Sequence, residues 1–328
     1  MTVSIIIAVK TWQKNLEECV GKCRELDFPD FEILILPDVD IGAYPAVVRM
    51  LSSEGTVPVR IIPTGPINPA RKRDMALGFA RGEIFAFLDD DAYPARDWLK
   101  KAMENFKDPA VAAVAGPGIT PFNDTSRQKA SGLVYSSLLV SAGFSYRYIP
   151  KKRREVDDFP SCNFLVRQEI FRELGGFKTD FWPGEDTKLC LEITKKLGKK
   201  IIYDPFVYVW HHRRPLFLPH LKQIASYALH RGYFAKKYPQ TSFKISYFIP
   251  TLFLICLVTG GILAVFLPFF RWLYFTGIIL YLLTGFIFSL SKELGLLPMV
   301  FLGIIFTHLV YGFHFLKGLL AKKLREER

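Results

Sequence analysis

Cysteine is scarce in this sequence. The five cysteines form no CxxC pair, so a thiolate metal motif or a redox dithiol of that kind is absent. Cys19 and Cys23 lie one helical turn apart, and we interpret them as small packed side chains. Internal repeats and low-complexity linkers are missing too, and a hydrophobic content of 50% excludes a disordered or collagen-like chain.

Charge is missing from three long stretches near the C-terminus. Ser246–Phe270, Trp272–Leu290 and Leu294–Leu316 contain no Asp, Glu, Lys or Arg. A bilayer core of about 30 Å needs roughly 20 apolar helical residues, so each stretch is long enough to cross. The amino terminus lacks a basic n-region and a small-residue cleavage site, which argues against a signal peptide. We therefore expect an integral protein of the cell membrane whose first 245 residues stay in the cytoplasm.

The net charge of +12 favours anionic membrane lipids or phosphorylated substrates as partners. No nucleic-acid-reading motif is present, so we expect no nucleic acid partner. Three spans would put the basic tail on the far side of the membrane, contrary to the positive-inside tendency. Either one apolar stretch is re-entrant or interfacial, or the short tail, which also holds Glu326 and Glu327, is too weak a signal. The basic tail residues are Lys322, Lys323, Arg325 and Arg328.

Short apolar runs rich in β-branched residues alternate with helical segments along the N-terminal part of the chain. Such runs suit parallel strands buried on both faces, and the alternation predicts a doubly wound α/β sheet. The expected strands are Val3–Val9, Phe31–Leu36, Val57–Ile62, Glu83–Leu88, Val111–Ala115 and Asn163–Val166, and the expected helices are Asn15–Leu26 and Pro69–Ala80. Phe206–Trp210 indicates another strand, and Pro219–Lys237 mixes apolar and polar residues as an interfacial helix does.

Three consecutive acids follow the strand expected at Glu83–Leu88. Open parallel sheets bind ligands beyond the carboxyl ends of their strands, so Asp89, Asp90 and Asp91 stand where a site is expected. Asp89 and Asp91 are two residues apart and point to the same side of an extended chain. Together they can hold Mg²⁺ or Mn²⁺ beside substrate phosphate oxygens. The alternative is an acidic turn that caps the following segment.

Glu185 and Asp186 begin a further expected helix, which runs to Leu197. They follow a sharply turned entry at Trp182–Gly184, and no other carboxylate has a comparable context. Asp186 is therefore the candidate general base. The alternative is that both acids only stabilise the helix dipole, with no catalytic role.

A basic cluster follows the last expected strand. His211 and His212 offer imidazoles for a metal, with His212 as the candidate ligand, and Arg213 and Arg214 suit bidentate contacts to a diphosphate. The alternative is a basic patch at the membrane surface.

Taken in order, these segments resemble the membrane-bound family 2 glycosyltransferases of GT-A fold, including the cellulose-synthase-like branch. The resemblance covers most of Val3–Lys237 and continues loosely into the apolar stretches. It is carried by Val3–Val9, by Phe31–Asp38, by Gly82–Asp91 with its Asp-Asp-Asp, by Asn163–Arg167 with Gly175–Phe177, and by Pro183–Asp186. The resemblance implies an α/β, GT-A doubly wound mixed sheet, followed by an interfacial helix and a C-terminal transmembrane helix region.

The resemblance also implies an inverting transfer of a sugar from a nucleoside diphosphate donor, with a divalent metal, Mn²⁺ or Mg²⁺. Asp186 matches the general base and Glu185 its supporting neighbour. Asp91 is the more direct metal ligand, with Asp89 and His212 as further ligands. The donor-binding candidates are Ala8, Val9, Asp38, Lys72, Asp89, Asp90, Arg213 and Arg214, and the acceptor-binding candidates are Asn163, Trp182, Gln223 and Tyr227.

Departures from the family pattern bear on the acceptor. Gln223–Tyr227 falls where the processive branch has QxxRW, but it lacks the Arg and has Tyr in place of Trp. Pro37 and Trp12 stand where acids are common, which leaves the donor base open. Three spans are also few for a polysaccharide channel, so we expect the addition of one sugar.

We expect a hexose, mannose favoured, to move from GDP-mannose or a UDP-sugar to a hydroxyl of a polyprenyl- or dolichyl-linked saccharide at the cytoplasmic face, as in N-glycan or other glycan assembly. The alternatives are a polyprenyl-phosphate mannosyl- or glucosyltransferase and a non-catalytic glycan-binding membrane protein. The expected regions are a catalytic domain at 1–218, an interfacial helix at 219–245, about three transmembrane helices at 246–317 and a basic tail at 318–328.

Overall fold

The computed structural model describes residues 1–41, 44, 47, 57–291 and 293–327. The chain forms two compact units. The first unit comprises Met1–Ile119 and Ile149–His212, and the second comprises Thr120–Tyr148 and Arg213–Arg328. Residues 120–148 therefore pack with the C-terminal part of the chain, although they lie inside the 1–218 region that the sequence indicates as one domain.

A mixed eight-stranded sheet forms the centre of the first unit. Its strands are β1 (Val3–Ala8), β2 (Phe31–Leu36), β3 (Val59–Ile61), β4 (Ile84–Asp89), β6 (Val111–Ala115), β8 (Arg154–Val156), β9 (Asn163–Arg167) and β10 (Lys200–Tyr203), in the order β3-β2-β1-β4-β9-β6-β10-β8. Strand β1 pairs in parallel with β2 and β4, whereas β9 is antiparallel to both β4 and β6. The predicted mixed α/β sheet is confirmed.

The central strands are buried on both faces, as their continuous apolar sequences predict. Ser4 and Glu32 are polar exceptions on β1 and β2, and they satisfy each other through a hydrogen bond of 2.8 Å from Ser4 Oγ to Glu32 Oε1. Gly82 donates its N–H to the same Ser4 Oγ. A Cβ at Gly82 would lie 2.4 Å from the backbone nitrogen of Ser4, so only glycine lets the chain approach β1 this closely before β4 begins.

A second, three-stranded sheet lies beyond the acid-bearing end of β4. It contains β5 (Ala92–Pro94), β11 (Val209–His211) and β7 (Gly118–Ile119), in the order β5-β11-β7. Strand β11 is antiparallel to β5 and pairs His211 with Ala92, the residue that follows Asp91. The expected strand at Phe206–Trp210 begins only at Val209, because the Asp204 carboxylate accepts the N–H of Phe206 and holds a turn there.

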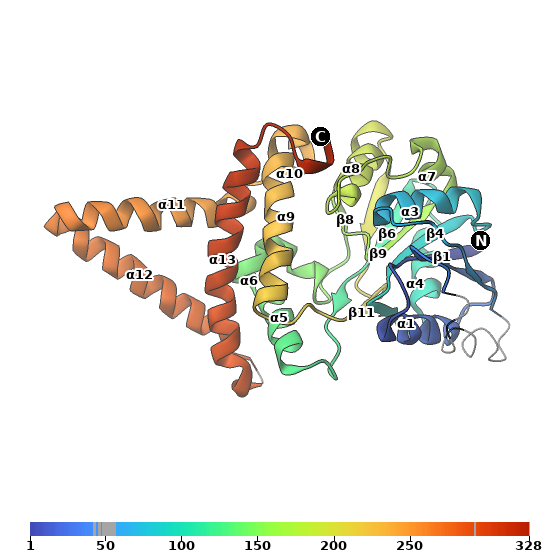
Figure 1. Cartoon of the computed structure of the whole chain (residues 1–328), viewed down its shortest axis with the longest axis horizontal. Helices are drawn as coiled ribbons and strands as arrows, with labels where there is room; N and C mark the ends of the chain where they lie inside the picture. The colour runs from blue at the N-terminus through green and yellow to red at the C-terminus, as the bar shows by residue number, and fades with distance from the viewer. Residues whose placement is uncertain (42–43, 45–46, 48–56, 292, 328) are drawn as a thin grey trace. The chain divides into compact units, whose positions relative to one another are not determined.

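The helices of the first unit cover its eight-stranded sheet (Figure 1). They are α1 (Lys14–Arg24), α3 (Pro69–Met75), α4 (Trp98–Asn105), α7 (Gln168–Leu174) and α8 (Glu185–Leu191), which continues as a π-helix over Glu192–Lys196. Helix α3 begins at a proline after Asn68, whose side chain accepts the N–H of Arg71. Cys19 and Cys23 are buried in the core on α1, which confirms the packing role expected for them.

The second unit is helical. It contains α5 (Ser126–Ser136), α6 (Leu138–Ser141), α9 (Leu218–Lys237), α10 (Pro239–Ser242), α11 (Ile245–Phe266), α12 (Pro268–Ser289) and α13 (Leu297–Leu320). Among the described residues, three helical segments are long and apolar enough to cross a membrane, and they correspond to α11, α12 and the segment containing α13. Helices α11 and α12 form a hairpin that projects away from α9 and α13 (Figure 1).

Candidate active site

Four consecutive charged residues on α3 each bind a different segment of the first unit. The run is Arg71-Lys72-Arg73-Asp74, of which the sequence indicated only Lys72 as a site residue. Arg71 pairs with Asp180 on the protein surface, through Nη2 and Oδ2 at 2.8 Å. The other three side chains turn toward the core, so this short helix fixes the relative positions of several loops at the end of the sheet.

Lys72 joins three parts of the predicted donor pocket. Its side chain is 2% exposed. The ammonium group donates to the carbonyl oxygens of Val9 and Leu36 and forms an ion pair with Asp38. Because a buried ammonium needs such partners, Lys72 holds the Asp38 carboxylate beside the loop that Ala8 and Val9 begin. The structure therefore brings four of the predicted donor-binding residues together.

Arg73 connects the acids at the end of β4 to the first turn of α8. Its guanidinium donates from Nη2 to Asp89 Oδ1 at 2.6 Å and from Nη1 to Glu185 Oε1 at 3.0 Å. Ser161 Oγ lies 2.9 Å from the same Nη1 and also donates to Glu185 Oε1 at 3.0 Å. The backbone N–H of Gly184 donates to Glu185 Oε2 at 3.0 Å. Glu185 is therefore a buried anchor for the first turn of α8.

Asp186, the candidate base, follows Glu185 on the first turn of α8. The backbone N–H of Thr187 donates to Asp186 Oδ1 at 2.7 Å, which fixes the carboxylate, and the side chain is half-buried. Thr187 is anchored in turn by Asp158, which accepts its hydroxyl proton at 3.1 Å. Trp182, which is predicted to contact the acceptor, lies three residues before Glu185. The tryptophan is 51% exposed and therefore available to a ligand.

Asp89, Asp91 and His211 form a candidate metal centre. One ligand atom from each residue lies within 4.8 Å of the others. Asp91 Oδ1 and His211 Nε2 are 3.1 Å apart. Burial of the His211 ring opposes its protonation, but the neighbouring Asp91 carboxylate raises the pKa of the imidazole to about 10. Two carboxylates with one imidazole fit Mn²⁺ better than Mg²⁺, which prefers oxygen ligands.

His212, the predicted metal ligand, points elsewhere. Its Nε2 lies 3.0 Å from Glu18 Oε2 on α1, while its backbone N–H donates to the carbonyl oxygen of Asp91. Successive side chains of a strand alternate between its faces, so only one of the two histidines can face the acids. The structure brings His211 to Asp91, and the sequence alone gave no means of choosing between them. Asp90 lies half-buried in the turn between β4 and β5.

Asp74 on α3 accounts for the glycine at position 176 in the Gly175–Phe177 segment. Its carboxylate accepts the backbone N–H groups of Phe177 and Lys178 at 2.6 and 3.1 Å. Burial raises the pKa of Asp74 to about 6. Gly176 adopts a φ of +87°, and a Cβ there would lie 2.3 Å from Asp74 Oδ1. The loop after α7 can therefore close over Asp74 only with glycine at this position.

Asn163, predicted to contact the acceptor, is fully buried. Its amide donates to the carbonyl oxygens of Gly116 and Val207 at 2.8 and 2.7 Å and accepts from Trp98 Nε1 at 2.9 Å. These bonds tie β9 to α4 and to two loops. We therefore assign Asn163 a structural role and do not retain the predicted acceptor contact.

The remaining predicted site residues belong to the second unit. Arg213 is buried, donates from Nε to Thr120 Oγ1 at 3.2 Å and lies over the ring of Tyr148, whereas Arg214 is exposed. On α9, Gln223 donates to the hydroxyl of Tyr227 and accepts from the hydroxyl of Tyr135, each at 3.0 Å. The structure thus brings the two predicted acceptor residues of α9 into contact with each other.

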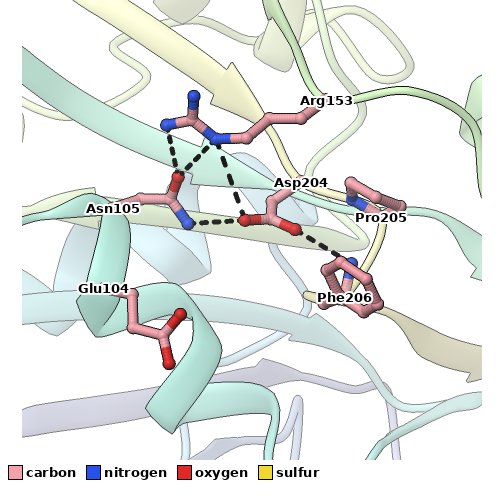
Figure 2. A pocket seen from close by; sticks show the side chains of 6 residues that line it. All are labelled: Glu104, Asn105, Arg153, Asp204, Pro205 and Phe206. Atoms are coloured by element: carbon pink, nitrogen blue, oxygen red, sulfur yellow. Dashed lines mark hydrogen bonds and ion pairs between the residues drawn. The ribbon is translucent and has the colours of Figure 1, made fainter.

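A separate open pocket of about 430 Å³ lies in the first unit (Figure 2). In its lining, Asn105 accepts from Arg153 Nη2 at 2.8 Å and donates to Asp204 Oδ2 at 2.8 Å. None of the predicted site residues lines it. Its polar groups mainly bind one another, so we do not assign this pocket to the candidate active site.

Two residues of the site, Arg73 and Ser161, escaped sequence reasoning, and His211 was named only as one of two histidines that could bind a metal. Arg73 and Glu185 are 112 positions apart in the chain, and nothing local marks them as partners. The run of charges directly after a helix cap was an available signal, because it falls in a helix expected to pack on a sheet.

The comparisons with known proteins agree with this fold. A mannosyltransferase from Pyrobaculum calidifontis, solved with GDP-Man and Mn²⁺, superposes with a TM-score of 0.68 at 21% identity, over 98% of this chain and 88% of that one, and so has the same fold. A Methanococcus voltae protein named dolichyl N-acetyl-alpha-D-glucosaminyl phosphate 3-beta-D-2,3-diacetamido-2,3-dideoxy-beta-D-glucuronosyltransferase is 26% identical over 271 residues, covering 78% of this chain and 80% of that protein.

The pre-mycofactocin glycosyltransferase of Mycobacterium tuberculosis is 32% identical over 147 residues, which is 44% of this chain. The match covers only 30% of that relative's length. The family model described as glycosyl transferase family 2 matches residues 4–175, more than half of the chain. With its mixed α/β sheet, its acids at the end of β4 and this match, the chain belongs to glycosyl transferase family 2.

Proposed function

We propose that this glycosyltransferase moves a hexose, with mannose favoured, from a nucleoside diphosphate sugar to a hydroxyl of a polyprenyl- or dolichyl-linked saccharide, at the cytoplasmic face of the cell membrane. The observation that carries the proposal is the buried connection Asp89–Arg73–Glu185, which joins the metal-binding acids to the residue before Asp186. GDP-Man in the Pyrobaculum mannosyltransferase supports mannose, and the name of the Methanococcus relative supports a dolichyl-linked acceptor.

The donor binds at the carboxyl ends of β1, β2 and β4. Asp38, held by Lys72, contacts the base or ribose, and Val9 borders the same pocket. Asp91, Asp89 and His211 would hold the divalent cation, which when bound neutralises negative charge on the diphosphate. Arg73 keeps the Asp89 carboxylate oriented through its bond of 2.6 Å.

Asp186 acts as the general base. It takes the proton of the acceptor hydroxyl while the hydroxyl oxygen forms a bond to the anomeric carbon and the bond from that carbon to the diphosphate breaks. A single in-line displacement inverts the anomeric centre. A phosphate acceptor is already ionised and gains little from a base, so Asp186 favours a hydroxyl acceptor over bare polyprenyl phosphate.

The test uses the full-length purified protein with radiolabelled GDP-mannose, UDP-glucose or UDP-N-acetylglucosamine, Mn²⁺ and a lipid-linked saccharide fraction. Label should enter the lipid fraction from GDP-mannose, and Asp186→Asn should slow the transfer by about 10²–10⁴-fold. Glu169→Gln is the matched control, because Glu169 is an exposed acid in the first turn of α7. Transfer by Asp186→Asn at the wild-type rate would refute the proposed base.

Two outcomes of the same assay would replace the proposal. Labelling of bare polyprenyl phosphate, with none of the lipid-linked saccharide, would identify a polyprenyl-phosphate glycosyltransferase. Nucleotide binding that is independent of Mn²⁺ and Mg²⁺, with no transfer from any donor, would indicate a glycan-binding membrane protein without turnover.

A further inference from the structure

Helix α13 is long and apolar enough to cross a bilayer, but its two ends are tied to segments that precede every candidate span. Before Ile245 the described residues contain no candidate span. Just ahead of α13, Glu293 accepts from Lys129 of α5 at 2.7 Å. Just after α13, Glu326 lies 3.3 Å from His230 of α9, and Lys236 of α9 donates to the carbonyl oxygen of Ala321 at 2.6 Å. Both ends of α13 are therefore on one side of the membrane.

Contacts with the same polar segments continue along the length of α13. Thr307 Oγ1 lies 3.0 Å from His220 Nε2, and His308 Nε2 lies 3.0 Å from the carbonyl oxygen of Leu139. Further along, Gly318 leaves room for the backbone of Leu229, because a Cβ there would lie 1.9 Å from the Leu229 carbonyl oxygen. Helices α9 and α13 thus run side by side in the same direction, as Figure 1 shows.

Helix α9 cannot enter the hydrocarbon core with α13. It carries Lys222, Arg231, Lys236 and Lys237, and all three lysines are exposed on its surface. Charged side chains in the centre of a bilayer are costly unless they reach an interface. A helix that packs along α9 for this distance has to share its depth.

Except for Lys317 in its last turn, the exposed large side chains of α13 form one apolar stripe. Leu302, Phe306, Phe313 and Leu320 are 43%, 43%, 57% and 72% exposed. Their spacing of four and seven residues puts them on one helix face, with Leu309 and Leu316 between them. The opposite face is packed against protein. That opposite face packs against α9, whose exposed lysines keep both helices out of the hydrocarbon core, so α13 lies in the plane of the membrane with its apolar stripe toward the lipid.

Helices α11 and α12, which form the hairpin, have the character of spanning helices. Only 17% and 11% of their apolar windows are buried, against 33% for the segment containing α13. Each has 22 residues, which gives a length of about 33 Å, enough for the bilayer core. Exposed Arg271 and Trp272 stand near the tip, as residues at a membrane–water interface do.

Helix α13 crosses the open end of this hairpin. Thr251, in the second turn of α11, donates from Oγ1 to the carbonyl oxygen of Gly312 at 2.9 Å. Tyr281, in the second half of α12, places its hydroxyl 2.9 Å from His308 Nδ1. The ring contacts of α13 with the hairpin involve Phe248 and Phe253 in the first half of α11 and Phe286 near the end of α12, which lie toward the same open end. We propose that, within the described part of the chain, α11 and α12 are the only spans, and that α13 lies at the membrane surface with its apolar stripe in the lipid.

This topology removes the conflict with the positive-inside tendency. With two spans, Lys322, Lys323 and Arg325 return to the side of the membrane that holds the first unit. The bilayer is the partner of the stripe, and the basic tail lies where anionic lipid head groups attract it.

Sided labelling of single cysteines in sealed vesicles tests the topology. In a chain lacking Cys162 and Cys256, cysteine replaces exposed Glu25 in the first unit, Lys323 in the tail or Phe269 at the hairpin tip. A membrane-impermeant maleimide should label Glu25→Cys and Lys323→Cys from the same side, and Phe269→Cys only from the other. Labelling of Lys323→Cys from the side opposite Glu25→Cys would overturn the proposal, as would a Phe269→Cys that reacts from neither side.

A depth measurement tests the position of α13 independently. A fluorophore is attached to cysteine at Leu302, Leu309 or Leu320, with Val258→Cys in the middle of α11 as the control. Lipids that carry a quencher near the head group should quench the three α13 positions to the same extent, and lipids with a deep quencher should act mainly on Val258→Cys. Deepest quenching at Leu309 would mean that α13 spans. No quenching at any α13 position would mean that a second protein copy covers the stripe.

Discussion

Nη1 of Arg73 lies 3.0 Å from Oε1 of Glu185, and the two side chains are only 4% and 5% exposed. The same guanidinium binds Asp89, so one arginine positions both the acids at the end of β4 and the helix that bears Asp186. A buried ion pair of this kind contributes little net stability, but loss of one partner leaves an uncompensated buried charge. The pair therefore serves mainly to orient the acids at the end of β4 and the helix that bears Asp186, and Arg73 on α3 is the residue that links them.

Arg73→Met should destabilise the protein and abolish most activity. Removal of one partner of a buried pair costs about 3–5 kcal/mol, which the unfolding transition in detergent measures. The double variant Arg73→Met, Glu185→Leu should recover much of the stability without recovering sugar transfer.

Arg71→Met is the matched control on the same helix. The Arg71–Asp180 pair is 58% and 45% exposed, and an exposed pair contributes about 0–1 kcal/mol. Equal destabilisation by the two substitutions would contradict the role assigned to Arg73.

His211→Ala should weaken Mn²⁺ binding at least about tenfold, in line with the loss of a ligand or its close support, whereas His212→Ala should leave it unchanged. The reason is that His211 joins Asp89 and Asp91, while His212 binds Glu18. Electron paramagnetic resonance of free Mn²⁺ measures binding without any need for turnover. The opposite order of the two histidines would show that the ligand is the one indicated by the sequence.

Acid should destabilise the second unit through His220. Burial lowers the pKa of His220 to about 4, and its ring nitrogens bind Ser131 and Thr307. Between pH 6.5 and 4 the unfolded chain therefore holds a proton on this ring that the folded chain does not, so stability falls as the pH falls through this window. His220→Gln should show a smaller loss of unfolding temperature between pH 7 and pH 5 than the wild type; an identical loss would exclude His220 as its source.

Gly176→Ala should cost about 1–3 kcal/mol, because the residue is held at positive φ and the added Cβ meets Asp74. Gly21→Ala in α1 is the control, since nothing lies within 4 Å of its Cβ position. That substitution should stabilise the protein by about 0.5–1 kcal/mol. Denaturant unfolding compares both, and a neutral Gly176→Ala would mean that the loop does not need the tight approach to Asp74.

The strands of the sheet were predictable because burial on both faces leaves a continuous apolar run. Phe31–Leu36 and Val111–Ala115 match β2 and β6 residue for residue. The antiparallel direction of β9 was not predictable from alternation, since the same apolar pattern fits either direction. Helix α3 ends at Met75 rather than Ala80, because the chain tightens there into a 3₁₀ turn.

The site was predictable only where chemistry and position coincide in a short segment. Asp91 and Asp186 each stand at the end of a strand or the start of a helix, where ligands are expected. The choice of His211 over His212 depends on the pairing of β11 with β5, and the role of Arg73 depends on a contact across 112 positions. Neither relationship leaves a local signal in the sequence.

The most direct test of the account is the effect of GDP and UDP on thermal unfolding of the full-length protein, with and without Mn²⁺, in the wild type and in Asp91→Asn. Ligand that binds the folded state raises the unfolding temperature in proportion to the logarithm of its saturation. The account predicts a rise with one nucleotide that requires Mn²⁺ and is lost in Asp91→Asn. An equal rise without Mn²⁺, or an undiminished rise in Asp91→Asn, would contradict a metal-dependent donor site at the end of β4.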